Sequence, residues 1–309
     1  MPVEENQNKL LKGDVILIID GHAHIFKKVA GMTKARPTTS LTWGKVKVGD
    51  EVCQWFPPCF SESNAPAEML MTFMDWVGID KALIVNHQQY GYNNEYVSEI
   101  IHKYPHRFAA LATLDFFKGE ESVKYLEEIS KSKIFKGIKF EVPHSFQCYP
   151  DMKINDPSIM PIWRQCNNLN IPVMMHMRPG DLPALKEIYQ QFRDIIIIIS
   201  HLGNPPYKGW TELIDFAKNA NRIYFDISAL PWQFAAWEEY PYPNAQEHIK
   251  IARDEVGAER LIWGSDFPMI LSVCTYQQTI NLIRKGCGFL SKNEKDKILG
   301  DNIFRLLNL

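Results

Sequence analysis

The chain has 309 residues, of which 46% are hydrophobic and 23% charged, values that are ordinary for a globular protein with a large core. Its 34 basic and 36 acidic residues give a net charge of -2, and no basic run exceeds a pair, which argues against nucleic acid or an anionic membrane as partner. The start, MPVEENQNKLLKGD, lacks an apolar core, and no apolar stretch reaches 18 residues, so we expect neither a signal peptide nor a transmembrane helix. The six cysteines show no C-x-x-C spacing, which indicates reduced thiols and a cytoplasmic protein.

Short apolar segments alternate with helix-length amphipathic segments along most of the chain. The five consecutive isoleucines at 195–199 are apolar on both faces, which is typical of a strand in a parallel sheet covered on both sides. Ser291, with Glu294 three residues later, predicts the start of a last, carboxyl-terminal helix. Eight strands, each followed by a helix, favour an α/β fold, a (β/α)8 TIM barrel in a single domain over residues 1–309. The predicted strands are 15–20, 82–85, 108–114, 137–140, 171–176, 195–201, 222–227 and 260–266.

Two connections that follow strands are too long to be turns. A long loop after the first strand covers about residues 25–66 and contains Trp55, and one after the seventh strand covers about 228–243 and contains Trp232. Both belong to the carboxyl-terminal face, where TIM barrels carry their active sites. Their aromatic residues either pack the loops or roof a pocket, and taken together they favour a roof over a flat or apolar substrate.

Metal-compatible side chains stand at the predicted carboxyl ends of four strands. His22 and His24 end the first strand, where alternate residues point to the same side. His176, His201 and Asp266 end the fifth, sixth and eighth strands. A single histidine at a strand end is often only a packed or loop residue. Five such residues at ends that converge on one barrel mouth favour a metal site instead.

The sequence resembles the amidohydrolase superfamily in four segments that follow the order of strands 1, 5, 6 and 8. They are DGHAH (20–24), PVMMH (172–176), ISHLGNP (199–205) and LIWGSDFP (261–268). The ending LSKNEKDKILGDNIFRLLNL resembles the last helix of the amidohydrolase-related branch. This branch holds aminocarboxymuconate-semialdehyde decarboxylase, resorcylate decarboxylase and several lactone hydrolases.

The resemblance implies that His22, His24, His176 and Asp266 bind one divalent metal ion, with zinc favoured and manganese as the alternative. Such a metal would activate a water molecule. Asp266 would take its proton, and His201 would polarise the substrate carbonyl or hold the developing oxyanion. Some lactone hydrolases of this branch work without metal, so the ligand set alone leaves occupancy open.

Other candidates carry weaker signals. Lys139 occupies the place of the carboxylated lysine of binuclear members, but its surroundings resemble the one-metal branch and favour a structural ion pair. Arg178 would face the mouth and clamp a substrate carboxylate if the fifth strand continued, or else is a solvated loop arginine. His87 and His144 follow the second and fourth strands and are either substrate contacts or ordinary loop histidines. The residues predicted to contact substrate are Arg178, His87, His144, Trp55 and Trp232.

We expect a metal-dependent hydrolase that cleaves a lactone or similar acyl bond in a small carboxylated ring compound. The segments HLGNP and WGSDFP resemble the hydrolases of the branch more than its decarboxylases. The alternative is a non-oxidative decarboxylase of an aromatic or unsaturated acid. A third reading, a ligand-binding barrel without catalysis, is disfavoured by the complete ligand set. Relatives in the branch are often dimers, which leaves a homodimer open.

Overall fold

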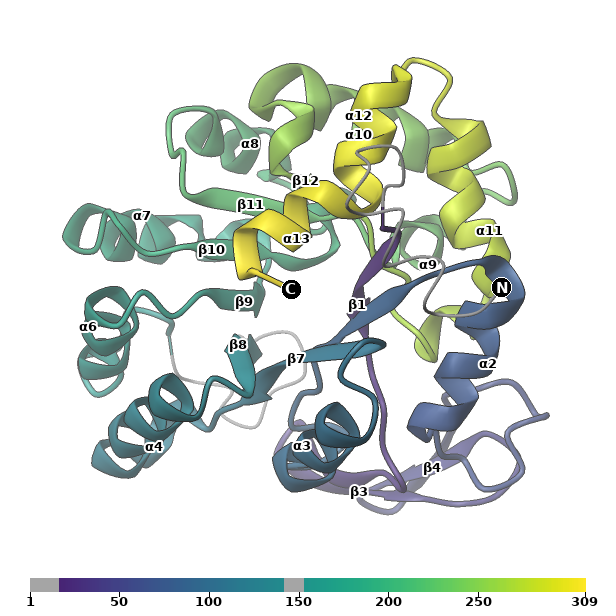
Figure 1. The fold of residues 1–309 in the computed structure, drawn as a ribbon, viewed down its shortest axis with the longest axis horizontal. Coiled ribbons are helices and arrows are strands. Elements are labelled where there is room, and N and C mark those ends of the chain that lie inside the picture. The colour runs from purple at the N-terminus through teal and green to yellow at the C-terminus, as the bar shows by residue number, and fades with distance from the viewer. Residues whose placement is uncertain (1–16, 142–152) are drawn as a thin grey trace.

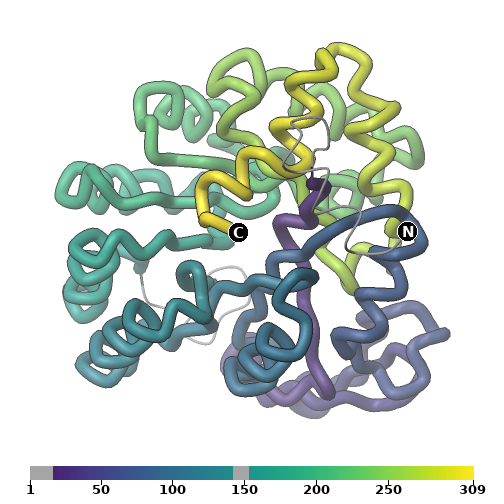
Figure 2. Tube along the Cα trace, viewed as in Figure 1, coloured from purple at the N-terminus to yellow at the C-terminus, as the bar shows by residue number. Residues whose placement is uncertain are grey.

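The computed structural model describes residues 17–141 and 153–309. An eight-stranded parallel sheet lies at its centre in the order β1-β6-β7-β8-β9-β10-β11-β12. Figure 2 shows the chain winding once around a ring in sequence order, so the predicted barrel is confirmed. The strands are β1 (Ile19–Ala23), β6 (Lys81–Ile84), β7 (Phe108–Thr113), β8 (Phe135–Glu141), β9 (Val173–His176), β10 (Ile197–Ile199), β11 (Ile223–Asp226) and β12 (Leu261–Ile262).

Helices surround the sheet and cover its outer face (Figure 1). The longer helices each bury one apolar stripe. In α7, for example, Leu182, Leu185 and Ile188 are buried at the spacing of one helix face. The helices are α2 (Ala67–Val77), α3 (Asn94–Lys103), α4 (Glu120–Ser132), α6 (Met160–Asn168), α7 (Leu182–Gln191), α8 (Trp210–Lys218), α9 (Leu230–Phe234), α10 (Pro243–Val256), α11 (Tyr276–Asn281), α12 (Lys292–Asp296) and α13 (Asn302–Leu307).

Hydrogen bonds between β1 and the chain around β12 join the two edges of the sheet. The Gly21 amide donates to the Trp263 carbonyl at 2.9 Å, and the Asp266 amide donates to the His22 carbonyl at 2.8 Å. Asp20, fully buried, accepts further hydrogen bonds from residues beyond β12. Closure of the barrel therefore holds two predicted metal ligands, His22 and Asp266, next to each other.

The predicted carboxyl-terminal helix is confirmed at its first residue. Ser291 caps α12, with its hydroxyl accepting from the Glu294 amide and the Glu294 carboxylate accepting from the Ser291 amide. The chain continues through a π-helical turn to α13, which lies across one end of the barrel (Figure 1). Ile303 and Leu307 pack there with the interior residues of the strands. The helix therefore closes the end of the barrel opposite the strands' carboxyl termini.

The connection after β1 differs from the predicted long loop. Four antiparallel strands form a small separate sheet in the order β2-β3-β4-β5. Residues Lys45–Val48 alternate between exposed and buried side chains, as a half-buried strand requires. Gly49, with a positive φ of 60°, lies in the turn that leads to the next strand. The strands are β2 (Ala30–Thr33), β3 (Arg36–Ser40), β4 (Lys45–Val48) and β5 (Glu51–Gln54).

The connection after β11 contains the short helix α9, which carries Trp232. Its indole is 48% exposed, so it stands at the surface rather than in the core. Within residues 17–141 and 153–309, no helix is both long and apolar enough to cross a bilayer.

Candidate active site

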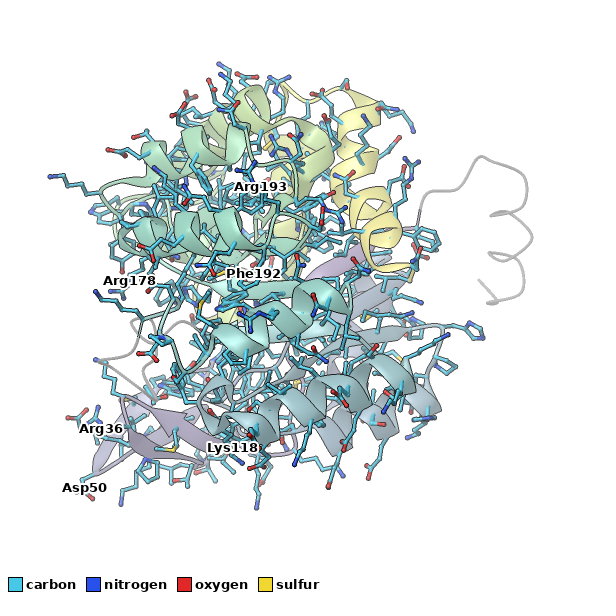
Figure 3. All side chains as sticks on the ribbon, turned by 90° about the vertical axis from the view of Figure 1, so that its left-hand side faces the viewer. Arg36, Asp50, Lys118, Arg178, Phe192 and Arg193 are labelled. Carbon is cyan, nitrogen blue, oxygen red and sulfur yellow. The ribbon has the colours of Figure 1, made fainter. Side chains whose placement is uncertain are left out.

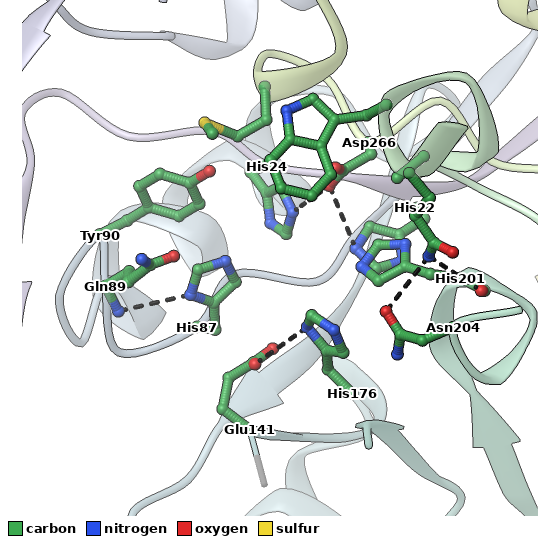
Figure 4. Close-up of a pocket in the computed structure, with 14 residues that line it drawn as sticks. His22, His24, His87, Gln89, Tyr90, Glu141, His176, His201, Asn204 and Asp266 are labelled. Carbon is green, nitrogen blue, oxygen red and sulfur yellow. Dashed lines mark hydrogen bonds and ion pairs between the residues drawn. The ribbon is translucent and has the colours of Figure 1, made fainter. Parts of the chain in front are cut away.

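A pocket opens at the carboxyl ends of the barrel strands (Figure 4). Residues from β1, β8 and β9 and from the loops after β6, β10, β11 and β12 meet there, as expected for a TIM barrel. Seven residues predicted from the sequence line it, namely His22, His24, His87, His176, His201, Trp232 and Asp266.

Three predicted ligands lie together and form what we call the His22 wall: His22, His24 and Asp266. Asp266 Oδ1 is 3.1 Å from His24 Nε2 and 3.6 Å from His22 Nε2, and one ligand atom of each residue lies within 4.8 Å of the others. His22 Nδ1, 2.9 Å from Asp226 Oδ2, donates its hydrogen there because a carboxylate oxygen only accepts. In neutral His22, the Nε2 lone pair therefore faces the Asp266 carboxylate. A cation between them would convert this repulsion into attraction, and this donor set suits zinc or manganese.

Asp226 supports this wall from behind and is fully buried. Its oxygens accept hydrogen bonds from His22 Nδ1, from the His201 amide at 3.2 Å, and from both the amide and the hydroxyl of Ser228. Burial alone would raise the pKa of Asp226, but the nearby His22 ring and these bonds hold it below its usual value. Asp226 also groups with His22 and His201 as a potential ligand. Because its oxygens are already engaged, we interpret it as the carboxylate that orients both histidines.

His201 lies beyond β10, which ends two residues earlier than predicted. Its backbone is left-handed, with φ of 56°, and Asp266, four residues past β12, has φ of 66°. This conformation is unfavourable for residues other than glycine, so the surrounding contacts hold both residues in place. The His201 ring lies 4.8 Å from the ring of His22 and 4.6 Å from that of His176. Burial lowers the pKa of His201 to about 3, which leaves the ring neutral near neutral pH.

The hydrogen bonds of Ser228 assign the tautomer of His201. The Ser228 hydroxyl donates to the Asp226 carboxylate, which can only accept. Its oxygen therefore accepts from His201 Nδ1, at 2.9 Å. A neutral His201 then carries its lone pair on Nε2. This tautomer makes His201 an acceptor of protons or hydrogen bonds rather than the oxyanion donor expected from the sequence.

The opposite side of the pocket, which we call the Glu141 wall, consists of Glu141 and His176, with the buried Lys139 behind them. Glu141 Oε2 is 3.3 Å from His176 Nδ1, and Glu141 Oε1 is 3.4 Å from Lys139 Nζ. Lys139 is 1% exposed and donates to Ser200 Oγ at 2.9 Å. Burial opposes ionisation of Glu141, but Lys139 holds the pKa of Glu141 well below its usual range. Lys139 is thus engaged in the ion pair favoured from the sequence, and a fourth-ligand role for His176 stays a prediction.

His87 forms part of the pocket between the two walls. Its ring lies 4.9 Å from the His24 ring and 4.6 Å from the Tyr90 ring (Figure 4). Burial lowers the pKa of both His87 and His24 well below 6.5. Both rings are therefore neutral near neutral pH, the form in which imidazole can bind a metal or accept a hydrogen bond.

Two predicted substrate contacts, Arg178 and Trp55, are not brought into the described pocket. Arg178 points outward (Figure 3), and its guanidinium lies 4.7 Å from the centre of the Tyr207 ring. The prediction assumed that the strand continues, but β9 ends at His176, so the alternation stops before Arg178. Trp55 directly follows β5 and packs edge-on against Phe56. It is not among the described residues that line the pocket. His144 lies outside the described residues.

Sequence reasoning missed several polar residues of this region, among them Gln89 and Tyr90 in the loop after β6. Asp226 and Glu141 are the last residues of β11 and β8, so the rule that selected His176 at the end of its strand could have found them. Asn204 and Gln233 line the pocket from irregular or short helical segments. No spacing in the sequence points to these two residues.

The family model Amidohydro_2, described as amidohydrolase, matches residues 19–309. The chain belongs to this amidohydrolase family. A curated relative, the L-fucono-1,5-lactonase of Burkholderia ambifaria, is 22% identical over 201 residues, which are 62% of this chain and 66%, just under two thirds, of that relative.

Two solved structures illustrate the shared fold. An amidohydrolase from Burkholderia multivorans with bound zinc has a TM-score of 0.71 at 13% identity, covering 95% of this chain and 99% of that one. A probable 2-pyrone-4,6-dicarboxylic acid hydrolase from Acinetobacter baumannii has a TM-score of 0.70 at 20% identity, covering 94% of this chain and 99% of that one. At these identities the likeness establishes the barrel, and the site has to be argued from its own residues.

Proposed function

We propose that this amidohydrolase holds one divalent metal ion, zinc in preference to manganese, and hydrolyses a lactone or similar acyl bond. The observation that carries the proposal is the convergence of His22 Nε2, His24 Nε2 and Asp266 Oδ1 on one point of the pocket. The lactonase relative and the zinc-containing structure support the reaction and the metal. When bound, a divalent cation lowers the pKa of water and polarises a carbonyl oxygen.

Asp266 and His201 would carry out the proton transfer and the orientation of the water molecule. Asp266, next to both histidines, accepts a proton from the attacking water as the new carbon–oxygen bond forms. It then returns that proton to the ring oxygen when the lactone carbon–oxygen bond breaks, so the product is an open hydroxy acid. His201 Nε2 accepts a hydrogen bond from the same water or from the substrate, held in orientation by Ser228 and Asp226.

Elemental analysis of protein purified without chelator or nickel affinity resin tests the metal. We expect close to one zinc or manganese per chain, and its loss in the double variant His22→Ala/His24→Ala. His102→Ala is the matched control, because this exposed histidine on α3 bonds only the Ser98 carbonyl in the described structure. Absence of metal after incubation with zinc and manganese would contradict the proposed mechanism.

Product analysis separates hydrolysis from the alternative reaction. Ring opening of lactones is followed by acid release with a pH indicator, and decarboxylation of aromatic acids by release of carbon dioxide. We expect acid release from lactones only. Carbon dioxide release without lactone opening would instead support the decarboxylase.

A further inference from the structure

The histidines that line the described pocket differ in which ring nitrogen carries the hydrogen. Three of them direct Nδ1 at an oxygen that accepts it, namely His22 at Asp226 at 2.9 Å, His176 at Glu141 at 3.3 Å, and His201 at Ser228 at 2.9 Å. A neutral imidazole has a single hydrogen on its two nitrogens, so each of these rings presents Nε2 as an acceptor or a metal ligand. None of the three then donates from Nε2 to a substrate oxygen.

His87 has the opposite arrangement. The Gln89 backbone amide donates to His87 Nδ1 at 3.4 Å. A backbone amide can only donate, so this nitrogen carries no hydrogen, and the ring is neutral with its hydrogen on Nε2. His87 lines the pocket, and its second ring nitrogen faces the pocket interior (Figure 4). The ring therefore offers a hydrogen-bond donor to a molecule bound there.

The loop that carries His87 is held in place by the small sheet. Within the loop, the Tyr90 amide donates to the His87 carbonyl at 3.1 Å, which closes a turn. From the small sheet, the Ala30 amide donates to the Tyr90 carbonyl at 3.2 Å. Gly31 allows this close approach, because a Cβ atom there would lie 1.9 Å from the Gln88 carbonyl oxygen. The small sheet thus fixes the position of the His87 ring relative to the barrel.

His87 also lies beside the His22 wall. Its ring is 4.9 Å from the ring of His24, whereas the ring of His201 is 4.8 Å from that of His22. A donor, His87, and an acceptor, His201, therefore flank the proposed metal ligands. A carbonyl oxygen that accepts from His87 would lie next to the place where the attacking water is bound.

Two amide side chains at the described pocket donate within the protein instead. Gln233 Nε2 donates to the His201 carbonyl at 3.1 Å and to the Asn204 oxygen at 3.2 Å, which uses both of its hydrogens. Asn204 Nδ2 donates to the Met177 carbonyl at 2.6 Å. Among the described residues that line the pocket there is no lysine or arginine. A neutral donor is therefore the group available to a substrate oxygen that gains negative charge, and His87 supplies one.

We propose that His87 Nε2 donates the hydrogen bond that holds the carbonyl oxygen of the substrate during hydrolysis. This inference rests on the proposed lactone hydrolysis and supplies the donor that His201, as an acceptor, does not provide. As water adds to the carbonyl carbon, the π electron pair moves onto the oxygen, and the hydrogen bond from His87 strengthens. It weakens again when the ring carbon–oxygen bond breaks and the carbonyl re-forms. His87 keeps its hydrogen throughout, so the proton transfers stay with Asp266.

NMR spectroscopy of isotope-labelled histidine side chains tests the tautomer without any substrate. Correlations between the ring hydrogens and the ring nitrogens distinguish a nitrogen that carries hydrogen from one that does not, and His87→Asn identifies the signals of His87. We expect hydrogen on Nε2 of His87 and on Nδ1 of His201. Hydrogen on Nδ1 of His87 would overturn the inference whatever the turnover. Hydrogen on Nε2 in a protein that opens no lactone would support the donor and contradict the proposed reaction.

Two substitutions test the role of the donor in turnover. His87→Gln places an amide N–H near the position of Nε2, whereas His87→Asn keeps an oxygen near Nδ1 for the Gln89 amide and does not reach the position of Nε2. On a lactone that the unmodified protein opens, His87→Asn should lower kcat by roughly tenfold to a hundredfold and change KM by less than about twofold, because the hydrogen bond strengthens in the transition state. His87→Gln should lower kcat by only about threefold.

His106→Asn is the matched control, because this exposed histidine lies before β7, at the opposite end of the barrel strands, and should leave kcat unchanged. Equal losses of kcat in His87→Gln and His87→Asn would indicate a structural role for the ring and overturn the inference. Full activity of His87→Asn would also overturn it. Loss of bound metal in either variant would contradict the donor role, since it would make His87 a ligand.

Discussion

The two walls of the pocket contain similar pairs of residues in different states. In each, a histidine Nδ1 faces a carboxylate: His22 faces Asp226 at 2.9 Å, and His176 faces Glu141 at 3.3 Å. Asp226 is fully buried and engaged by four hydrogen bonds, whereas Glu141 lines the pocket and is paired with His176 and Lys139. The same pairing therefore serves two purposes. On one side it orients His22, a proposed metal ligand, and on the other it holds an ion-paired carboxylate at the pocket surface.

Among the single substitutions, replacement of His201 should reduce kcat the most. His201→Asn should reduce kcat by roughly a hundredfold to ten-thousandfold and retain the bound metal, because the variant loses a proton acceptor and keeps His22, His24 and Asp266. Steady-state kinetics together with metal analysis checks this. Full activity in the variant would remove His201 from the mechanism, and loss of metal would make it a ligand.

Neutralising the two carboxylates separately tests the comparison between the walls directly. Asp226→Asn should weaken metal binding by about tenfold to a hundredfold, since it misorients His22. Glu141→Gln, which keeps the shape of that side chain, should weaken metal binding less, because Glu141 pairs with His176 and Lys139 and not with His22. Metal titration of both variants provides the measurement. Equal metal affinities would mean that the two walls do not differ as described.

Acid should lower the free energy of unfolding through the buried histidines of the pocket. The folded pKa of His201, about 3, lies below the 6.5 of an exposed histidine, so the unfolded chain binds more protons between these values and stability falls as the pH decreases. For His201 alone the loss is about 2 kcal/mol between about pH 7 and about pH 5. Urea unfolding of chelator-treated protein at both pH values measures it. The pH dependence should be weaker in His201→Asn, and an unchanged slope would exclude His201 as its source.

Replacement of Arg178 should have the smallest effect on kcat/KM. Arg178→Ala should change kcat/KM by less than about twofold for neutral lactones, because the side chain packs over Tyr207 outside the pocket. A large rise in KM would show that Arg178 reaches the substrate after all, and would favour a carboxylated one.

Hydrophobic periodicity in the sequence predicts the strands of the barrel and also one strand of the small sheet. Continuous apolar runs such as 195–199 predict parallel strands because both faces are covered. The alternating segment KVKV at 45–48 carried an equally valid strand signal, followed by a glycine turn. The length and aromatic content of residues 25–66 instead favour a long loop, and they do not distinguish such a loop from a small antiparallel sheet.

By itself, the sequence determined the barrel and the residues at its strand ends, since strand order and side-chain alternation are local properties and parallel strands end on one face. Only the tertiary structure decided how those residues act. The left-handed backbone at His201 and Asp266, the shared carboxylate of Asp226 and the outward course of Arg178 all depend on contacts between segments far apart in the chain. Such contacts determine which nitrogen of a histidine carries the hydrogen, the charge of a buried carboxylate and the direction in which the Arg178 side chain extends. The spacing of residues in the sequence carries no information on these properties.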